Sequence, residues 1–206
     1  MTNLNLVSRV CFGCSIVISL LAGGGLLLAA EKPSETQIFD ALKSRGTRGV
    51  PTAEEQRRSN EDRNLIESLR AKPSRSLSTE DRTKAAELAQ RKPSIDLEIN
   101  FEYDSAVIGS QARDVLVNLG TVIRKPDFNG AVFLLAGHTD AKGGVEYNLT
   151  LSERRAEAVK KFLSEKFGIP AGNLVPIGYG KETPKNKADP FASENRRVQV
   201  VNLYGR

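Results

Sequence analysis

The stretch GHTDAKGGVEYNLTLSERRA, Gly137–Ala156, joins a predicted strand to a predicted helix through a loop that holds an acidic residue and two glycines. The strand, residues 131–136, is apolar at every position, which predicts a central strand covered on both faces of a sheet. The helix is expected from about Leu151 to Phe167, with Gly168 and Pro170 as its stop. A strand–loop–helix unit therefore forms the centre of an α/β fold.

The other elements of residues 94–206 follow from similar patterns. Apolar and polar residues alternate over Ile95–Phe101, which predicts a strand with one buried face. A helix with apolar residues at three- and four-residue spacing is expected from about Ala106. A short strand at 174–177 and a last alternating strand at 196–203 complete the order βαβαβ–β. This order predicts an α/β sandwich with two helices on one face of a mixed four-stranded sheet.

Two charged residues of the central unit suggest a ligand. Asp140 follows the carboxyl end of an inner strand, where ligands of α/β folds bind. Arg155 is expected in the first turns of the next helix, beside free backbone N–H groups that favour anions. Together they offer an acceptor for a cation and a forked donor for a carboxylate, which suits a small zwitterion such as an amino acid. In the alternative, Asp140 only caps its own loop and Arg155 pairs with Glu153, with Glu157 or with a neighbour at the solvent-exposed surface.

The same stretch resembles the signature of the OmpA-like carboxy-terminal domain family, which includes domains of OmpA, Pal and MotB proteins. The resemblance covers roughly residues 94–204. It continues in INFEYDS at 99–105, in GYG at 178–180 and in NRRV at 195–198. It implies a domain that binds peptidoglycan without catalysis, through the diaminopimelate of the peptide stem.

By motif position, the resemblance also implies site residues. Asp140 and Arg155 match the pair that grips diaminopimelate in the family. Asn148 matches a polar position that lines the same pocket, and Arg197 matches a further basic residue near it. Asp104 falls where the family has another pocket-lining polar residue, although a turn-forming Asp at a strand end is the alternative.

An enzyme is the competing class of function. Glycoside cleavage needs two convergent acids, and Glu146 has no evident partner beside Asp140. Ser152, His138 and Asp140 suggest a hydrolytic triad, but the sequence has neither a nucleophile elbow nor an oxyanion motif. His138 is the single histidine and is expected to be structural. We therefore expect no catalytic residue, no metal and no cofactor.

The amino terminus indicates export. Residues 10–30 are almost wholly apolar and end in Leu-Ala-Ala, which predicts a signal peptide (residues 1–30) cleaved after Ala30. The alternative is an uncleaved anchor, because about twenty apolar residues span a bilayer. Cys11 and Cys14 lie in this segment, and one such pair does not make a zinc ligand set. Cleavage would leave no thiol, which suits the periplasm or outer membrane of a Gram-negative-type envelope.

Residues 31–93 differ from the rest in composition. Charged residues of both signs dominate, and Phe39 is the only aromatic residue. Such a stretch buries too little apolar surface to fold as an independent domain, which predicts a flexible linker. Short helices are expected at 35–45 and after the capping-box patterns that begin at Thr52 and Ser78. Their small apolar stripes indicate docking faces rather than sites.

The charge balance bears on partners. The chain has 30 basic and 25 acidic residues, for a net charge of +5, and the two signs are mixed along it. No basic patch is interleaved with aromatic residues, which argues against nucleic acid. A mild positive charge is compatible with an anionic polymer or a membrane surface, so the expected partners are peptidoglycan and the membrane of the cell envelope.

Overall fold

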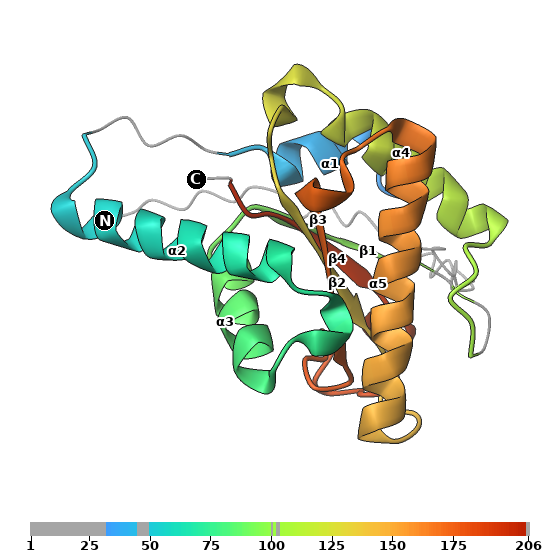
Figure 1. Ribbon diagram of the computed structural model, residues 1–206. Helices are drawn as coiled ribbons and strands as arrows, with labels where there is room; N and C mark the ends of the chain where they lie inside the picture. Colours follow the sequence, from blue (N-terminus) through green and yellow to red (C-terminus); the bar gives the residue numbers. More distant parts are fainter. Residues whose placement is uncertain (1–31, 45–49, 100, 102–103, 205–206) are drawn as a thin grey trace, which may run out of the picture. The chain divides into compact units, whose positions relative to one another are not determined.

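The computed structural model describes residues 32–44, 50–99, 101 and 104–204 (Figure 1). Its centre is a sheet of four strands in the order β1-β4-β2-β3. The strands are β1 (Ser94–Leu97), β2 (Phe133–His138), β3 (Leu174–Gly180) and β4 (Val198–Asn202). β2 and β3 are parallel, whereas β4 runs antiparallel to both β1 and β2. The mixed four-stranded sheet predicted from the sequence is confirmed.

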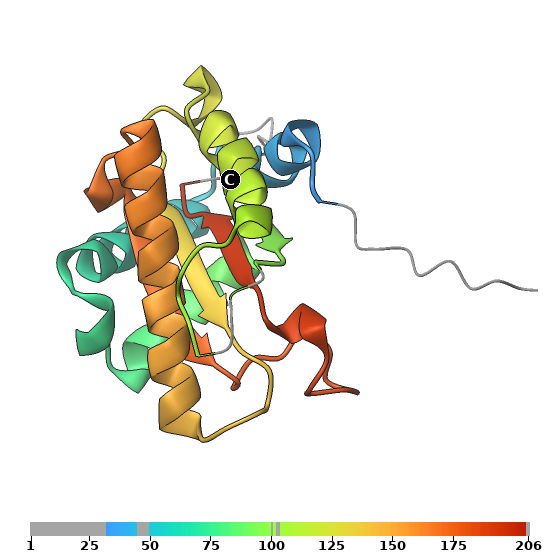
Figure 2. The same cartoon turned by 90° about the vertical axis from the view of Figure 1, so that its right-hand side faces the viewer.

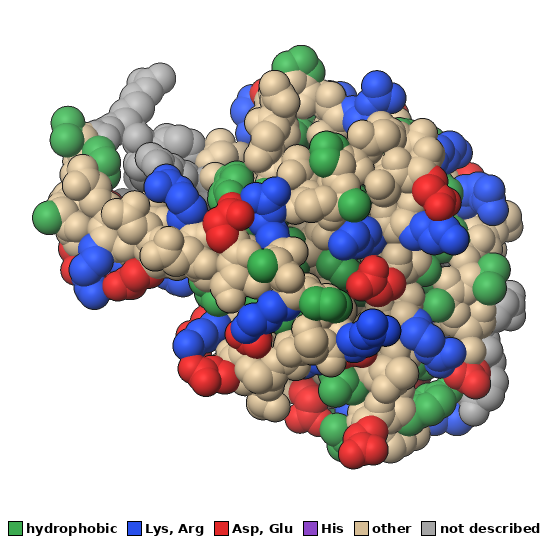
Figure 3. Space-filling view, in the orientation of Figure 1, with side chains coloured by type: hydrophobic (Ala, Val, Ile, Leu, Met, Phe, Trp, Pro, Cys, Tyr) green, Lys and Arg blue, Asp and Glu red, His purple; other side chains and the backbone are tan. Residues whose placement is uncertain are grey.

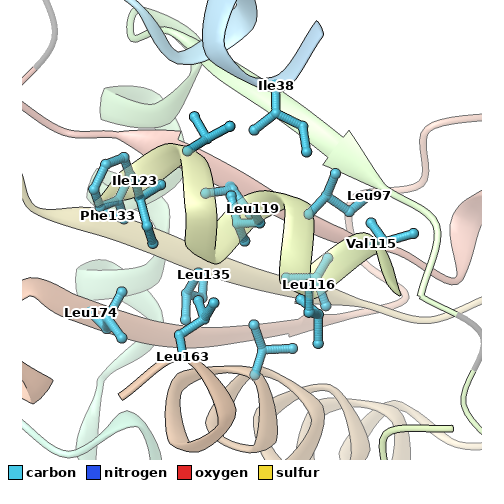
Figure 4. Close-up of a cluster of buried hydrophobic side chains, with 14 of the residues drawn as sticks. Ile38, Leu97, Val115, Leu116, Leu119, Ile123, Phe133, Leu135, Leu163 and Leu174 are labelled. Carbon is cyan, nitrogen blue, oxygen red and sulfur yellow. The ribbon is translucent and has the colours of Figure 1, made fainter. Parts of the chain in front are cut away.

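One face of the sheet is covered by α4 (Ser110–Ile123) and α5 (Val145–Phe167), which lie side by side in Figure 2. This is the predicted arrangement of two helices on one face. Figure 4 shows the apolar core that they form with the strands. A shorter helix, α1 (Glu35–Leu42), adds Ile38 and Leu42 to the same core, and both are 0% exposed.

The opposite face of the sheet is covered by α2 (Ala53–Ala71), a short 3-10 turn, η1 (Ser74–Ser76), and α3 (Thr79–Gln90). Their buried apolar side chains pack on the sheet and include Ile66, Leu69, Leu77, Ala85 and Leu88. The sheet side of this second core is formed by Val132, Leu134, Ala136, Val175, Ile177, Tyr179, Val201 and Leu203. The predicted flexible linker is therefore a docked helical layer over this part of the chain, because the strands present a second apolar face that needs a cover.

Arg82 of α3 joins this layer to the rest of the domain. Its Nη2 lies 2.6 Å from Glu153 Oε1 of α5, and both side chains are more than four-fifths buried. Its Nη1 donates to the Gly178 carbonyl of β3 at 2.7 Å, and its own carbonyl accepts from the Tyr179 hydroxyl at 3.2 Å. A buried ion pair is tolerated when such additional hydrogen bonds satisfy its polar atoms. α3 is thus held by polar contacts as well as apolar ones.

The three amino-terminal helices begin with capping boxes. The predicted boxes at Thr52 and Ser78 are confirmed, with Glu55 and Asp81 as their reciprocal partners. α1 has a third box, from Ser34, that the sequence analysis did not identify. In each box a side chain satisfies a backbone N–H group that the first helical turn leaves without a partner.

The first strand is shorter than predicted. β1 stops at Leu97, and Phe101 forms only an isolated bridge with Ile108. This bridge holds Ile108 outside the helix, so α4 begins at Ser110 instead of about Ala106. Residues 100 and 102–103, within the predicted strand and the turn after it, lie outside the described residues.

α5 is longer than predicted, since it begins at Val145 instead of Leu151. Gly143 has a φ of +96°, a conformation that favours glycine, and Gly144 is the extended residue before the first turn. The chain therefore enters the helix directly after the two glycines. The predicted stop at Gly168 is confirmed by its left-handed conformation.

The predicted signal peptide or anchor, residues 1–30, lies outside the described residues, as do Cys11 and Cys14. None of the helices in the described part of the chain combines the length and the apolar character needed to cross a bilayer. On the face shown in Figure 3, Lys and Arg side chains are interspersed with Asp and Glu.

Candidate ligand-binding site

Three segments meet beyond the carboxyl ends of β2 and β3: residues 104–109, 139–144 and 181–197 (Figure 2). The Ala141 N–H donates to the Pro190 carbonyl at 2.9 Å, which joins the second segment to the third. The first segment reaches α5, where Arg155 Nε donates to the Ser105 carbonyl at 3.2 Å. The loop predicted from Gly137–Ala156 therefore shares its end of the sheet with two other loops.

Glycines of the two parallel strands, β2 and β3, allow α5 to lie close to the sheet. A Cβ atom on Gly137 would overlap the Ser152 carbonyl oxygen, and one on Gly178 would lie 2.6 Å from the Glu153 backbone nitrogen. Ser152, which is 0% exposed, accepts a hydrogen bond on Oγ from the Gly180 N–H at 2.9 Å. These contacts fix the height and rotation of α5, and therefore the position of Arg155 on it.

Asp140 is held by its own loop and by one arginine. Its Oδ1 accepts from the Lys142 backbone N–H at 3.1 Å, which is the loop-capping role of the alternative considered above. Its Oδ2 accepts from Arg196 Nη1 at 2.9 Å, and only 16% of the Asp140 side chain is exposed. The structure thus places Asp140 in the site as an oriented carboxylate with a cationic partner.

Arg155 is buried in the wall of the same site, with 6% of the residue exposed. Its guanidinium lies over the Phe101 ring, 4.9 Å from the centroid, a cation–π geometry. Among the described residues it forms no ion pair with a carboxylate, and Glu153, one of its expected partners, pairs with Arg82 instead. Burying a cation without a full counter-charge is unfavourable, so this guanidinium favours an anionic ligand.

Several charged side chains act on the pKa of Arg155. Burial lowers the pKa of its guanidinium, and the nearby Asp140 charge opposes that shift. The positive charges of Arg196 and Arg154 lower the same pKa further, so three guanidinium groups act on one region. Asp140 and Arg155 therefore lie near enough to influence each other electrostatically, and their role as ligand contacts stays a prediction.

The source of the positive field differs from the prediction. Arg155 lies about three turns after Val145, where α5 begins, and not in its first turns. The free N–H groups at the helix start are thus not beside it, and the attraction for an anion comes from the arginines. The prediction was wrong on this point because it began the helix six residues too late.

Asn148 and Asp104 flank the site in different ways. Asn148 is 1% exposed and donates from Nδ2 to the Lys142 carbonyl at 2.9 Å, so it holds the loop that carries Asp140. Asp104 has a φ of +47° and pairs with Arg154 across 3.0 Å at the surface. The first is a buried support, and the second is an accessible charge at the edge of the site.

Arg197 is not brought to this site. Its side chain lies on the opposite face of the sheet, where Nε is 3.1 Å from Asp96 Oδ1 and only 8% of the side chain is exposed. The arginine that reaches Asp140 is its neighbour Arg196, which the sequence analysis missed. Successive residues of an extended chain point to opposite faces, so Arg196 shares the face of Val198 and Val200, which pack below α4 and α5. That alternation was the available signal.

His138 is a structural residue. It stacks on the Tyr179 ring with centroids 5.5 Å apart, and its Nδ1 lies 2.9 Å from Thr183 Oγ1. Burial, together with the charge of Arg197, lowers the pKa of His138 to about 3, so the ring is neutral at physiological pH. This agrees with the structural role expected for it.

The hydrolytic triad imagined from the sequence is not assembled. Ser152 Oγ donates to the Leu149 carbonyl at 2.7 Å and accepts from Gly180, while the His138 ring lies on the other face of the sheet with Tyr179. Within the described ranges, no three His, Cys, Asp or Glu side chains are grouped so that they could hold a metal ion. The geometry is that of a site that binds charges.

The family model that matches this chain is that of the OmpA family, over residues 100–197. This segment is an OmpA-family domain. It contains Asp104, Asp140, Asn148 and Arg155 as well as both arginines of the NRRV block. The docked layer of α2 and α3 precedes the matched segment.

Curated proteins are similar to this chain over a stretch of comparable length. The peptidoglycan-associated lipoprotein of Brucella melitensis is 37% identical over 112 residues, which cover 52% of this chain and 64% of that protein. Outer membrane porin F of Pseudomonas aeruginosa is 31% identical over 110 residues, 52% of this chain and 30% of the porin. The chain thus spans 64% of the length of the first of these relatives. The crystal structure of the peptidoglycan-associated lipoprotein from Burkholderia pseudomallei is 30% identical, with 50% of this chain and 86% of that one covered and a TM-score of 0.43.

Proposed function

We propose that this protein binds peptidoglycan non-covalently through its OmpA-family domain and tethers the cell envelope to the wall. The observation that carries the proposal is the buried Arg155 guanidinium, which has no carboxylate partner among the described residues and lies within electrostatic range of Asp140. The names of the relatives, peptidoglycan-associated lipoproteins among them, support the same ligand.

The proposed ligand within peptidoglycan is the diaminopimelate of the peptide stem. Its free end carries an ammonium and a carboxylate on one carbon atom. Arg155 would donate its two parallel N–H bonds to the carboxylate, which a lysine cannot do with one ammonium group. Asp140 would accept from the ammonium while it keeps Arg196, because an ionised carboxylate offers about four lone-pair sites.

The other predicted residues take different parts in this proposal. Asp104, at the exposed edge, is available to the ligand together with Arg154. Asn148 acts through the loop that it holds, because its side chain is buried against Lys142. Arg197 supports the sheet beside His138 rather than the ligand.

The proposed role is one of attachment in the periplasm or at the outer membrane, without catalysis. Residues 10–30 serve in it either as a signal peptide that is removed or as an anchor that holds the protein in the inner membrane. Mass spectrometry of the mature amino terminus separates these two: a chain that begins at Glu31 supports removal, and an intact amino terminus supports the anchor.

Co-sedimentation with purified sacculi tests the binding function. Arg155→Ala or Asp140→Ala leaves one end of the bound zwitterion desolvated and unpaired, which weakens binding by roughly 2–5 kcal/mol, enough to remove the protein from the pellet. Arg155→Lys, which keeps the charge but loses the fork, is expected to bind weakly as well. Arg58→Ala is the matched control, since Arg58 is an exposed arginine of α2 away from the site.

Two results would contradict the proposal. One is a folded double variant of Asp140 and Arg155 that sediments as well as the wild type. The other is the release of soluble muropeptides by the wild-type protein, which would indicate a wall hydrolase. Circular dichroism and thermal unfolding of each variant show whether a loss of sedimentation reflects the site or the fold.

A further inference from the structure

Exposed apolar side chains gather around the charged site. Six large apolar residues are classed as exposed in the part of the chain that the structure describes. Four of them stand on the segments that border Asp140 and Arg155, and we call these four the apolar rim: Val107, Val145, Tyr147 and Phe191. Single exposed apolar residues are ordinary, but four around one charged site are a feature that a ligand could use.

Phe191 is the most exposed aromatic side chain of the rim, at 65%, and its backbone is firmly fixed. Its N–H donates to Asp189 Oδ1 at 3.0 Å. The Asp189 carbonyl accepts from Asn195 Nδ2 at 3.0 Å, and Asn195 is 0% exposed. Asn195 Oδ1 also accepts from the Asn186 N–H at 2.9 Å, which closes the loop. A loop built around a buried amide therefore presents an aromatic ring to solvent.

This loop is attached directly to the site. The Pro190 carbonyl, next to Phe191 in the chain, accepts from Ala141, which is next to Asp140. Arg196, at the end of the same loop, makes the ion pair with Asp140. The loop that carries Phe191 is thus joined to the Asp140 segment at two points, through the Pro190 carbonyl and through the Arg196 ion pair.

We infer that Phe191 is a second binding element, which packs on the peptide-stem residue that adjoins the charged amino acid. The inference rests on the proposed function. A neighbouring peptide residue adds about 3.3–3.6 Å of chain, so the residues next to the charged amino acid are the parts of the stem nearest to the rim, and the sugars lie farther along the stem. An aromatic ring supplies apolar contact area at a small entropic cost when its backbone is already fixed.

Calorimetric titration with two probes tests this inference, using a diaminopimelate-containing tetrapeptide stem and free diaminopimelic acid. Phe191→Ala should weaken binding of the tetrapeptide roughly fivefold to thirtyfold, as truncation of an aromatic contact does, and leave the free amino acid unchanged. Val50→Ala, which truncates an apolar side chain that is 93% exposed and outside the rim, should change neither affinity.

The outcomes separate this inference from the proposed function. If Phe191→Ala leaves both affinities unchanged, or lowers both equally, the inference is overturned while peptidoglycan binding stands. An effect only on fragments that carry sugars would also overturn it, because the contact would then be with the glycan. If the wild-type protein binds neither probe nor sacculi, the proposed function itself fails.

Discussion

Replacing Leu88 by alanine tests whether α3 is part of the folded domain. Leu88 is 0% exposed and packs in the second core, against the face of the sheet opposite α4 and α5. Removing a fully buried leucine side chain costs about 2–5 kcal/mol, from lost transfer free energy and from the cavity that remains. For a domain of this size, that corresponds to a fall in the melting temperature of roughly 5–15 °C.

Urea unfolding followed by far-ultraviolet circular dichroism measures the change in the free energy of unfolding. Glu87→Ala is the matched control, because Glu87 is the exposed neighbour of Leu88 on the same helix. Its effect should stay within about 0.5 kcal/mol, as for most surface substitutions. Hydrogen exchange of α3 provides a second measurement, since a docked helix is protected almost as strongly as the strands below it.

A mobile tether predicts the opposite result. If α3 moved freely, Leu88→Ala would change the unfolding free energy of the domain no more than Glu87→Ala, and the amides of α3 would exchange rapidly. Either finding would refute the packing of the second core. A fall of about 2 kcal/mol or more with unchanged cooperativity would support one folded unit.

Two further predictions concern the close packing of α5 and the buried histidine. Gly178→Ala should destabilise the protein by about 1–3 kcal/mol in thermal unfolding, because the added Cβ would overlap the Ser152 side chain. Gly172→Ala is the control, since its Cβ would make only an ordinary van der Waals contact. Burial lowers the pKa of His138 from 6.5 to about 3 in the folded protein, so the unfolded state takes up the proton first as the pH falls. Stability should therefore decrease by about 1.4 kcal/mol per pH unit from pH 6.5 towards 3, and His138→Gln should remove that part of the slope in urea unfolding at several pH values.

Periodicity was enough to predict the sheet and the helices on its first face. The uniformly apolar β2 and the alternating β4 set which residues are buried, and Gly168 marks the end of α5 correctly. The element boundaries were less accurate, because they depend on local contacts. The bridge between Phe101 and Ile108 is one such contact, and periodicity does not show it.

The second helical layer was hidden by weak local signals. α2 and α3 each carry only two or three buried apolar residues among many charges, which is typical of a surface segment. The information lay instead in β2, whose apolar residues on both faces require two covers while α4 and α5 provide one. The need to bury the second apolar face of the sheet therefore explains why α2 and α3 pack against it, although their own composition suggests a linker.

Within the candidate site, the motif predicted Asp140 and Arg155 as ligand contacts but did not predict the arginine that pairs with Asp140. The NRRV block offers two adjacent arginines, and its composition does not say which one faces the site. The alternation of side chains along the strand does say which arginine faces the site, since Arg196 points to the side of α5 and Arg197 to the side of His138. The Phe191 loop was beyond sequence reasoning, because its shape depends on the buried amide of Asn195.

The docking of α1, α2 and α3 shortens the distance over which residues 32–93 could extend. As a fully extended linker, residues 32–93 would cover roughly 200 Å at about 3.3 Å per residue. In the structure the helices pack onto both faces of the sheet, so this length is not available for extension. Lys32 itself pairs with Asp114 of α4. Packed in this way, residues 32–93 add no reach to the domain, because the first described residue, Lys32, already lies against the surface of α4.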